Sequence, residues 1–143
     1  MSLSNVFNIA GSAMNAQTVR LNTTASNLAN AESIGSSIGE TYRARKAVFE
    51  VQPLQQDSLW PATDAEAGQG VRVGGVIESE APLRQEYSPN HPMADENGYI
   101  YYPNVNVVEE MADMISASRS FQINADIMNT AKQMLQRTLS LGQ

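Results

Sequence analysis

The first 31 residues contain a single charged side chain, Arg20, and no proline, and this lack of charge strongly limits how the chain can fold. Apolar residues recur there at alternating spacings of three and four, which predicts a helix over residues 3–30. This seam consists of Leu3, Phe7, Ala10, Met14, Gln17, Leu21, Thr24 and Leu28. The other faces carry Asn, Ser, Thr, Gln and Ala. Such faces can face water, but they can also be buried against similar ones without stranding a charge.

A second helix is predicted over residues 107–141. Asn106 precedes it as a capping residue, Glu109 stands at the capping-box position, and Gly142 follows as a stop. Its main seam is Val107, Met111, Met114, Ser118, Phe121, Ala125, Met128, Lys132, Leu135 and Leu139. A second apolar line is formed by Ile123, Ile127, Met134 and Leu141. Two apolar lines on one helix predict more than one partner surface.

Neither helix is expected to be stable alone, because the backbone entropy lost on ordering exceeds what one apolar seam returns on burial. The simplest arrangement packs the two helices antiparallel as a coiled-coil-like pair. The second apolar line then still lacks cover within one chain, and neighbouring copies would supply it. The largest seam residues, Phe121 and the methionines at 111, 114 and 128, are expected in the core of the pair.

Between the helices, residues 32–106 hold 11 acidic and 5 basic side chains. Strands are predicted over 42–51, over 71–77 with an irregularity at Gly74-Gly75, and over 99–102 after an Asn97-Gly98 turn. A long loop over 52–70 contains Trp60, a local packing anchor or a docking residue. The expected fold is α+β in three parts: an N-terminal helix (1–31), a small β-rich insert (32–106) and a C-terminal helix (107–143).

Composition removes several classes of function. The chain has no cysteine and one histidine, and its net charge is −6, which excludes thiol chemistry and argues against binding nucleic acid. His91, Asp95 and Glu96 lie close together, but the nearby prolines favour a turn over a metal site. The N-terminus lacks the features of a secretory signal, and no stretch is long and apolar enough to insert into a membrane. Arg43, Arg45 and Lys46 are interpreted as a solvated strand edge, or as partners of the acids at 78–86 in another subunit.

Four segments carry a family resemblance: Ala25–Ser33, Pro103–Met111, Ser116–Asn124 and Thr138–Gln143. They resemble the bacterial flagellar basal-body rod proteins, and in particular the proximal rod subunits. The segment around Leu59-Trp60-Pro61 departs from the family pattern, so no family role is assigned to Trp60.

The resemblance implies a structural subunit without catalysis, cofactor or metal. It implies export through the flagellar type III apparatus without a cleaved signal peptide. It also implies helical assembly with copies of itself and neighbouring rod proteins into a drive shaft that spans the periplasm. The family further implies helical ends that become ordered on assembly. The alternative is a helical adaptor or chaperone-like binding module that holds a partner helix.

Residues for the contacts between subunits are predicted from these patterns. Asn27 and Asn30 share a helix face, and they either fix the register of packed helices or end the helix with local bonds. The expected assembly residues are Asn27, Leu28, Asn30, Phe121, Ile123, Ile127, Met134 and Leu141, with Trp60 as a possible docking anchor.

Overall fold

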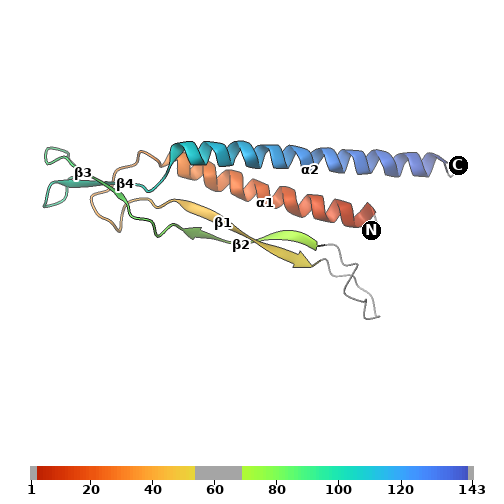
Figure 1. Cartoon of the computed structure of the whole chain (residues 1–143), viewed down its shortest axis with the longest axis horizontal. Helices are drawn as coiled ribbons and strands as arrows, with labels where there is room; N and C mark the ends of the chain where they lie inside the picture. Colours follow the sequence, from red (N-terminus) through yellow and green to blue (C-terminus); the bar gives the residue numbers. More distant parts are fainter. Residues whose placement is uncertain (1–2, 54–68, 142–143) are drawn as a thin grey trace.

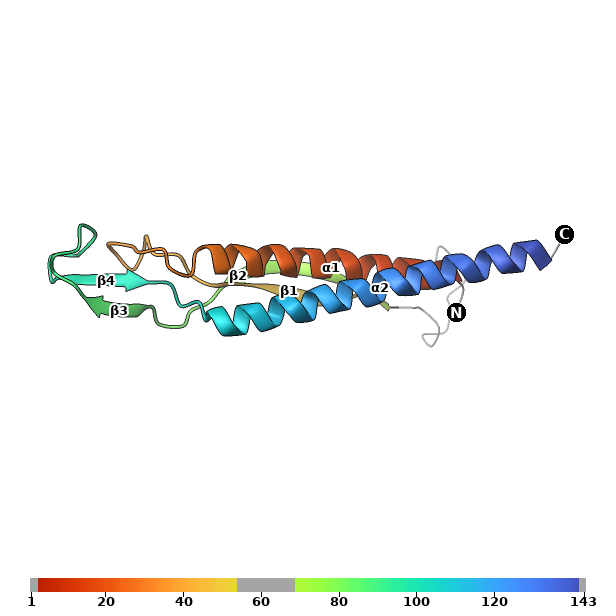
Figure 2. The same ribbon diagram turned by 90° about the horizontal axis from the view of Figure 1, so that it is seen from above.

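A computed structural model describes residues 3–53 and 69–141 of the chain. Two helices, α1 (Leu3–Ala29) and α2 (Val107–Leu141), run antiparallel side by side along an elongated molecule (Figure 1). Between them in sequence lie β1 (Arg45–Pro53), β2 (Gln69–Glu78), β3 (Arg84–Tyr87) and β4 (Tyr99–Tyr102). The β1–β2 ribbon lies along α1, and the β3–β4 hairpin extends beyond the end of the helix pair (Figure 2). The expected α+β fold with an antiparallel helix pair is confirmed.

The predicted helix bounds are nearly those observed. The helix α2 spans the predicted 107–141, and α1 ends at Ala29, one residue before the predicted end. At the start of α2 the Asn106 Oδ1 atom accepts the backbone N–H groups of Val108 at 3.1 Å and Glu109 at 3.5 Å. Asn106 is therefore the N-cap that the sequence predicted.

The core of the helix pair is built from small side chains. The buried residues of α1 are Ala10, Ala16, Thr24 and Asn27, and those of α2 are Glu110, Ala117 and Ala131. The three α2 residues stand seven and fourteen positions apart, on one heptad position between the two predicted apolar lines. Small residues on this face allow the two helices to approach closely, so the larger side chains lie on the flanks.

The prediction that the large seam residues form this core is therefore partly wrong. Met111 is 51% exposed and Phe121 is 37% exposed. Met114 and Met128 are half-buried. Heptad spacing located the helix correctly, but side-chain size rather than spacing decided which face meets α1.

The β1–β2 ribbon contains the predicted irregularity. Val48 pairs with Gly75 and Phe49 with Val73, so Gly74 is left without a partner in β1. A Cβ atom there would lie 2.5 Å from Glu50 Oε1, so the flexible Glu50 side chain would have to shift to make room for it. The strand β1 begins three residues later than predicted, at Arg45. Near the other end of the ribbon, Ser12 Oγ in α1 accepts the backbone N–H of Val71 at 3.1 Å.

The β3–β4 hairpin was only half predicted. The strand β4 lies where expected, but β3 was missed because all four of its residues are exposed and show no apolar alternation. The connecting turn has Gly98 at φ +81°, a left-handed conformation that favours glycine. Tyr87 and Tyr99 pack edge to face across the strands, with ring centroids 5.3 Å apart.

Asp95 organises the turn of this hairpin rather than a metal site. Its Oδ1 accepts the backbone N–H groups of Asn97 at 2.9 Å and Tyr99 at 2.8 Å, and its Oδ2 accepts the Tyr101 hydroxyl at 3.1 Å. These bonds, led by that from Tyr99, lower the pKa of the Asp95 carboxyl. Within residues 3–53 and 69–141 no three potential ligands converge on a metal position.

Candidate assembly surfaces

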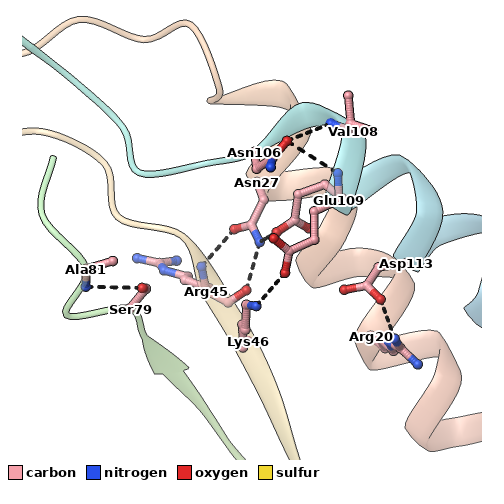
Figure 3. Close-up of polar contacts among 11 residues, drawn as sticks. Arg20, Asn27, Arg45, Lys46, Ser79, Ala81, Asn106, Val108, Glu109 and Asp113 are labelled. Atoms are coloured by element: carbon pink, nitrogen blue, oxygen red, sulfur yellow. Dashed lines mark hydrogen bonds and ion pairs between the residues drawn. The ribbon is translucent and has the colours of Figure 1, made fainter. Parts of the chain in front are cut away.

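Asn27 connects three parts of the fold near the C-terminal end of α1. Its Nδ2 donates to the backbone carbonyl of Arg45 at 2.8 Å and to Glu110 Oε1 at 2.9 Å. Its Oδ1 accepts the Tyr42 hydroxyl and the backbone N–H of Arg45, both at 2.9 Å. Figure 3 shows the Asn27 side chain between the two helices and the start of β1. All four hydrogen-bonding positions of the amide are used, and the side chain is 1% exposed.

Glu110 is the other buried polar member of this junction, at 5% exposure. Burial raises the pKa of its carboxyl, and the Asn27 bond opposes that shift without cancelling it. Two ion pairs surround it: Arg20 Nη2 lies 2.6 Å from Asp113 Oδ1, and Lys46 Nζ lies 3.0 Å from Glu109 Oε1 (Figure 3). Both pairs are partly exposed, so they are expected to add little to stability. Asn27 and Glu110 therefore set the register of the helix pair.

Removing the Glu110 charge is expected to change how stability depends on pH. Because the pKa of the Glu110 carboxyl is raised in the folded state, folding favours its protonated form. The resulting contribution to stability is lost as the pH rises above 4.5 and through the folded-state pKa. Glu110→Gln should therefore be more stable than the parent chain at pH 7, and the difference should vanish toward pH 4.5. Urea unfolding across this pH range measures it. A variant that is less stable than the parent at pH 7 would contradict the assignment.

Asn104 makes a second junction that the sequence analysis did not identify. Its Oδ1 accepts the backbone N–H of Ala44 at 2.8 Å, and its Nδ2 donates to the carbonyls of Ala81 at 2.9 Å and Ser79 at 3.3 Å. It thereby ties the segment before α2 to the start of β1 and the end of β2. An asparagine directly after Pro103, ahead of a capped helix, was the available signal.

The other predicted assembly residues of the segment Ala25–Ser33 behave differently from Asn27. Asn30 Nδ2 donates to the Ser26 carbonyl at 2.8 Å, a bond within its own helix end. Asn30 thus makes a local bond, whereas Asn27 makes a bond between the two helices, and the role of each residue in assembly stays a prediction. Leu28 is half-buried.

The basic residues at the start of β1 find partners within the chain. Arg45 Nη2 lies 3.1 Å from Glu78 Oε1, Lys46 pairs with Glu109, and Arg43 Nη1 donates to the Ser79 carbonyl at 3.1 Å. The interpretation as a solvated strand edge fits these contacts.

The second apolar line of α2 lies at the surface. Ile123 is 60% exposed, Ile127 42% and Met134 57%. With the first turns of α1 they line an apolar groove of about 480 Å³, formed by Leu3, Val6, Ile123, Asp126, Ile127, Thr130, Ala131 and Met134. The side chain of Leu141 and the whole of Trp60 lie outside the described residues.

The total surface also exceeds what a compact monomer needs. The chain exposes 10183 Å², whereas a compact monomer of this mass is expected to expose about 7,200 Å². The elongated shape of the helix pair contributes to this excess, and the apolar groove is part of the exposed surface. No helix in the described part of the chain is long and apolar enough to cross a membrane.

Comparison with known proteins agrees with this arrangement. Residues 7–32 match the family described as "Flagella basal body rod protein", and residues 96–141 match "Flagellar basal body rod FlgEFG protein C-terminal". These segments contain most of α1 and all of α2, which places the chain among the flagellar basal-body rod proteins.

Full-length relatives define the family more closely. The chain is 50% identical to the flagellar basal-body rod protein FlgC of Salmonella typhimurium (strain LT2), 49% to that of Escherichia coli O6:H1 and 47% to that of Yersinia enterocolitica. Each comparison covers 100% of both chains. The chain therefore belongs to the FlgC family.

Proposed function

We propose that this chain is a structural subunit of the proximal rod in the flagellar basal body, where it assembles helically through its terminal helices. Its partners are copies of itself and neighbouring rod proteins. It carries out no catalysis, and it reaches its place through the flagellar type III export apparatus. The rod that it forms is the drive shaft required for flagellum-dependent motility.

One observation carries this proposal. The two terminal helices, which match the rod-protein family models, keep their large apolar residues at the surface. Beyond residue 120 of α2, the most exposed of these within the described residues are Ile123, Met134 and Leu139. Monomeric proteins rarely leave apolar surface of this kind uncovered, and such surface marks an interaction site. In a rod, neighbouring subunits would cover it.

An adaptor or chaperone-like module is less well supported. Such a module would hold a partner helix with helices that are already rigid in the free protein. Here the N-terminal turns of α1 and the C-terminal half of α2 bury few large side chains between them. These parts are expected to open readily in the free chain.

Hydrogen exchange on two samples tests the proposal. In dilute monomer, amides in the first half of α1 and in α2 beyond residue 115 should exchange fast, whereas those near Asn27 and Glu110 stay protected. The same helices should be strongly protected in basal bodies isolated from cells that express the chain. Absence of the chain from these basal bodies, or full protection of both helices in dilute monomer, would refute a rod subunit that orders on assembly.

A further inference from the structure

The two ends of α2 have different surroundings. Leu3, at the start of α1, lines the same groove as Met134. Beyond this level α2 continues past the start of α1 (Figure 1), so its last turns have no helix beside them in the described part of the chain. Leu135 is 37% exposed and Leu139 is 66% exposed.

A defined face runs from the level of the groove into these last turns, and we call it the tail face: Lys132, Leu135 and Leu139. The spacing of three and then four residues places the three side chains on one side of the helix. The groove contains Ile123, Ile127 and Met134 on a different side of α2. An apolar groove and an apolar helix face thus lie near the same end of the molecule but point in different directions.

Charge favours a contact between the two surfaces. Among the described residues that line the groove, Asp126 is the charged one, and its carboxylate is negative. The tail face carries the positive Lys132, which is exposed. Two grooves facing each other would bring two Asp126 carboxylates together, and two tail faces would bring two Lys132 ammonium groups together. A groove facing a tail pairs opposite charges at the rim and apolar side chains at the centre.

We infer that the groove of one copy receives the tail face of a second copy, with Leu135 near Ile127 and Lys132 near Asp126. This inference rests on the proposed function, because it names the partner of the assembly surface. The contact joins unlike surfaces, so it does not close on itself in a dimer. Repeated from copy to copy it produces a ring where the rotation closes, and an open helical polymer, as a rod requires, where it does not.

Disulfide cross-linking tests the contact cleanly because the chain has no cysteine of its own. Ile127 and Leu135 are eight residues apart on one helix, about 12 Å, which is too far for a disulfide within a chain. A chain with both Ile127→Cys and Leu135→Cys should give a ladder of covalent multimers in basal bodies. Each single variant should stay monomeric on a non-reducing gel. The matched control combines Leu135→Cys with Ile115→Cys, since Ile115 is 60% exposed on α2 but outside the groove.

A ladder for the 127/135 pair without one for the 115/135 pair supports the inference. Equal ladders for both pairs, dimers from Leu135→Cys alone, or no cross-link in basal bodies that contain the chain would overturn it. Absence of the parent chain, without introduced cysteines, from basal bodies would instead refute the proposed function.

A charge exchange gives an independent measurement in case the cysteine variants do not assemble. Asp126→Lys and Lys132→Glu should each lower the yield of rods about fivefold, the effect expected for a surface ion pair at each contact. The double variant should restore the yield. A double variant no better than either single one would count against the pairing.

Discussion

Replacing Asn27 by alanine is expected to lower the free energy of unfolding by about 3–5 kcal/mol. The change removes four hydrogen bonds at once and leaves the backbone N–H and carbonyl of Arg45, the Tyr42 hydroxyl and the Glu110 carboxylate without their partner. Each buried group left unpaired costs about 1–3 kcal/mol, and water entering the space recovers part of this. Since small domains are stable by only about 5–15 kcal/mol, this loss removes a large share of the total stability.

Urea unfolding followed by far-UV circular dichroism measures this loss. The matched control is Asn30→Ala, three residues away in the same segment. The Asn30 amide donates to the Ser26 carbonyl of its own helix end. Its cost should stay near 1 kcal/mol or below. If the two alanine variants were equally stable, Asn27 would not be the residue that holds the register of the helices.

The sequence was sufficient to predict the elements whose cause is local. Helix bounds follow from Asn106 as a cap and from uninterrupted apolar spacing, and the bulge in the β1–β2 ribbon follows from the two adjacent glycines. The strand β3 was not predictable in this way, because the exposed residues of Arg84–Tyr87 are set by pairing with β4 and not by any pattern of their own.

The identity of the core depended on contacts that sequence spacing does not contain. Ala117 and Ala131 are buried because they let α1 approach, whereas Met111 and Phe121 belong to the better apolar seam and remain exposed. Asn27 stood out in the sequence, but its partners Arg45 and Glu110 are 18 and 83 residues away. Spacing arguments identify neighbours on one helix and cannot reveal such distant ones.

A division of roles along the helix pair follows from these contacts. At the end near Asn27, buried polar groups fully satisfied within one chain fix the register of α1 against α2. At the other end, small core residues leave the large apolar side chains of α2 at the surface. A polar junction is costly to break and specific in geometry. The junction therefore defines one alignment of the helices before any neighbour binds, whereas the groove end, which buries few large side chains, is expected to become ordered when a neighbour covers it.

Placing a carboxylate in the groove is accordingly expected to block rod formation without unfolding the chain. Ile127 is 42% exposed, so Ile127→Asp leaves the charge in water in the free chain. On assembly the same charge would be buried against apolar side chains at a cost of several kcal/mol. This corresponds to roughly a thousandfold weaker association at every repeated contact. Cells that carry the variant should fail to swim in soft agar, and electron microscopy should show basal bodies without rods.

The β1–β2 ribbon provides the internal control, because its amides should exchange with solvent at the parental rate in the purified variant. Ile115→Asp is the matched substitution, since Ile115 is even more exposed, at 60%, and lies on α2 outside the groove. Cells that carry Ile115→Asp should form rods and swim measurably. Normal motility of the Ile127→Asp strain would remove the groove from the interface. Equal loss in both strains would show that a charge anywhere on α2 prevents assembly, and that the groove has no special part in it.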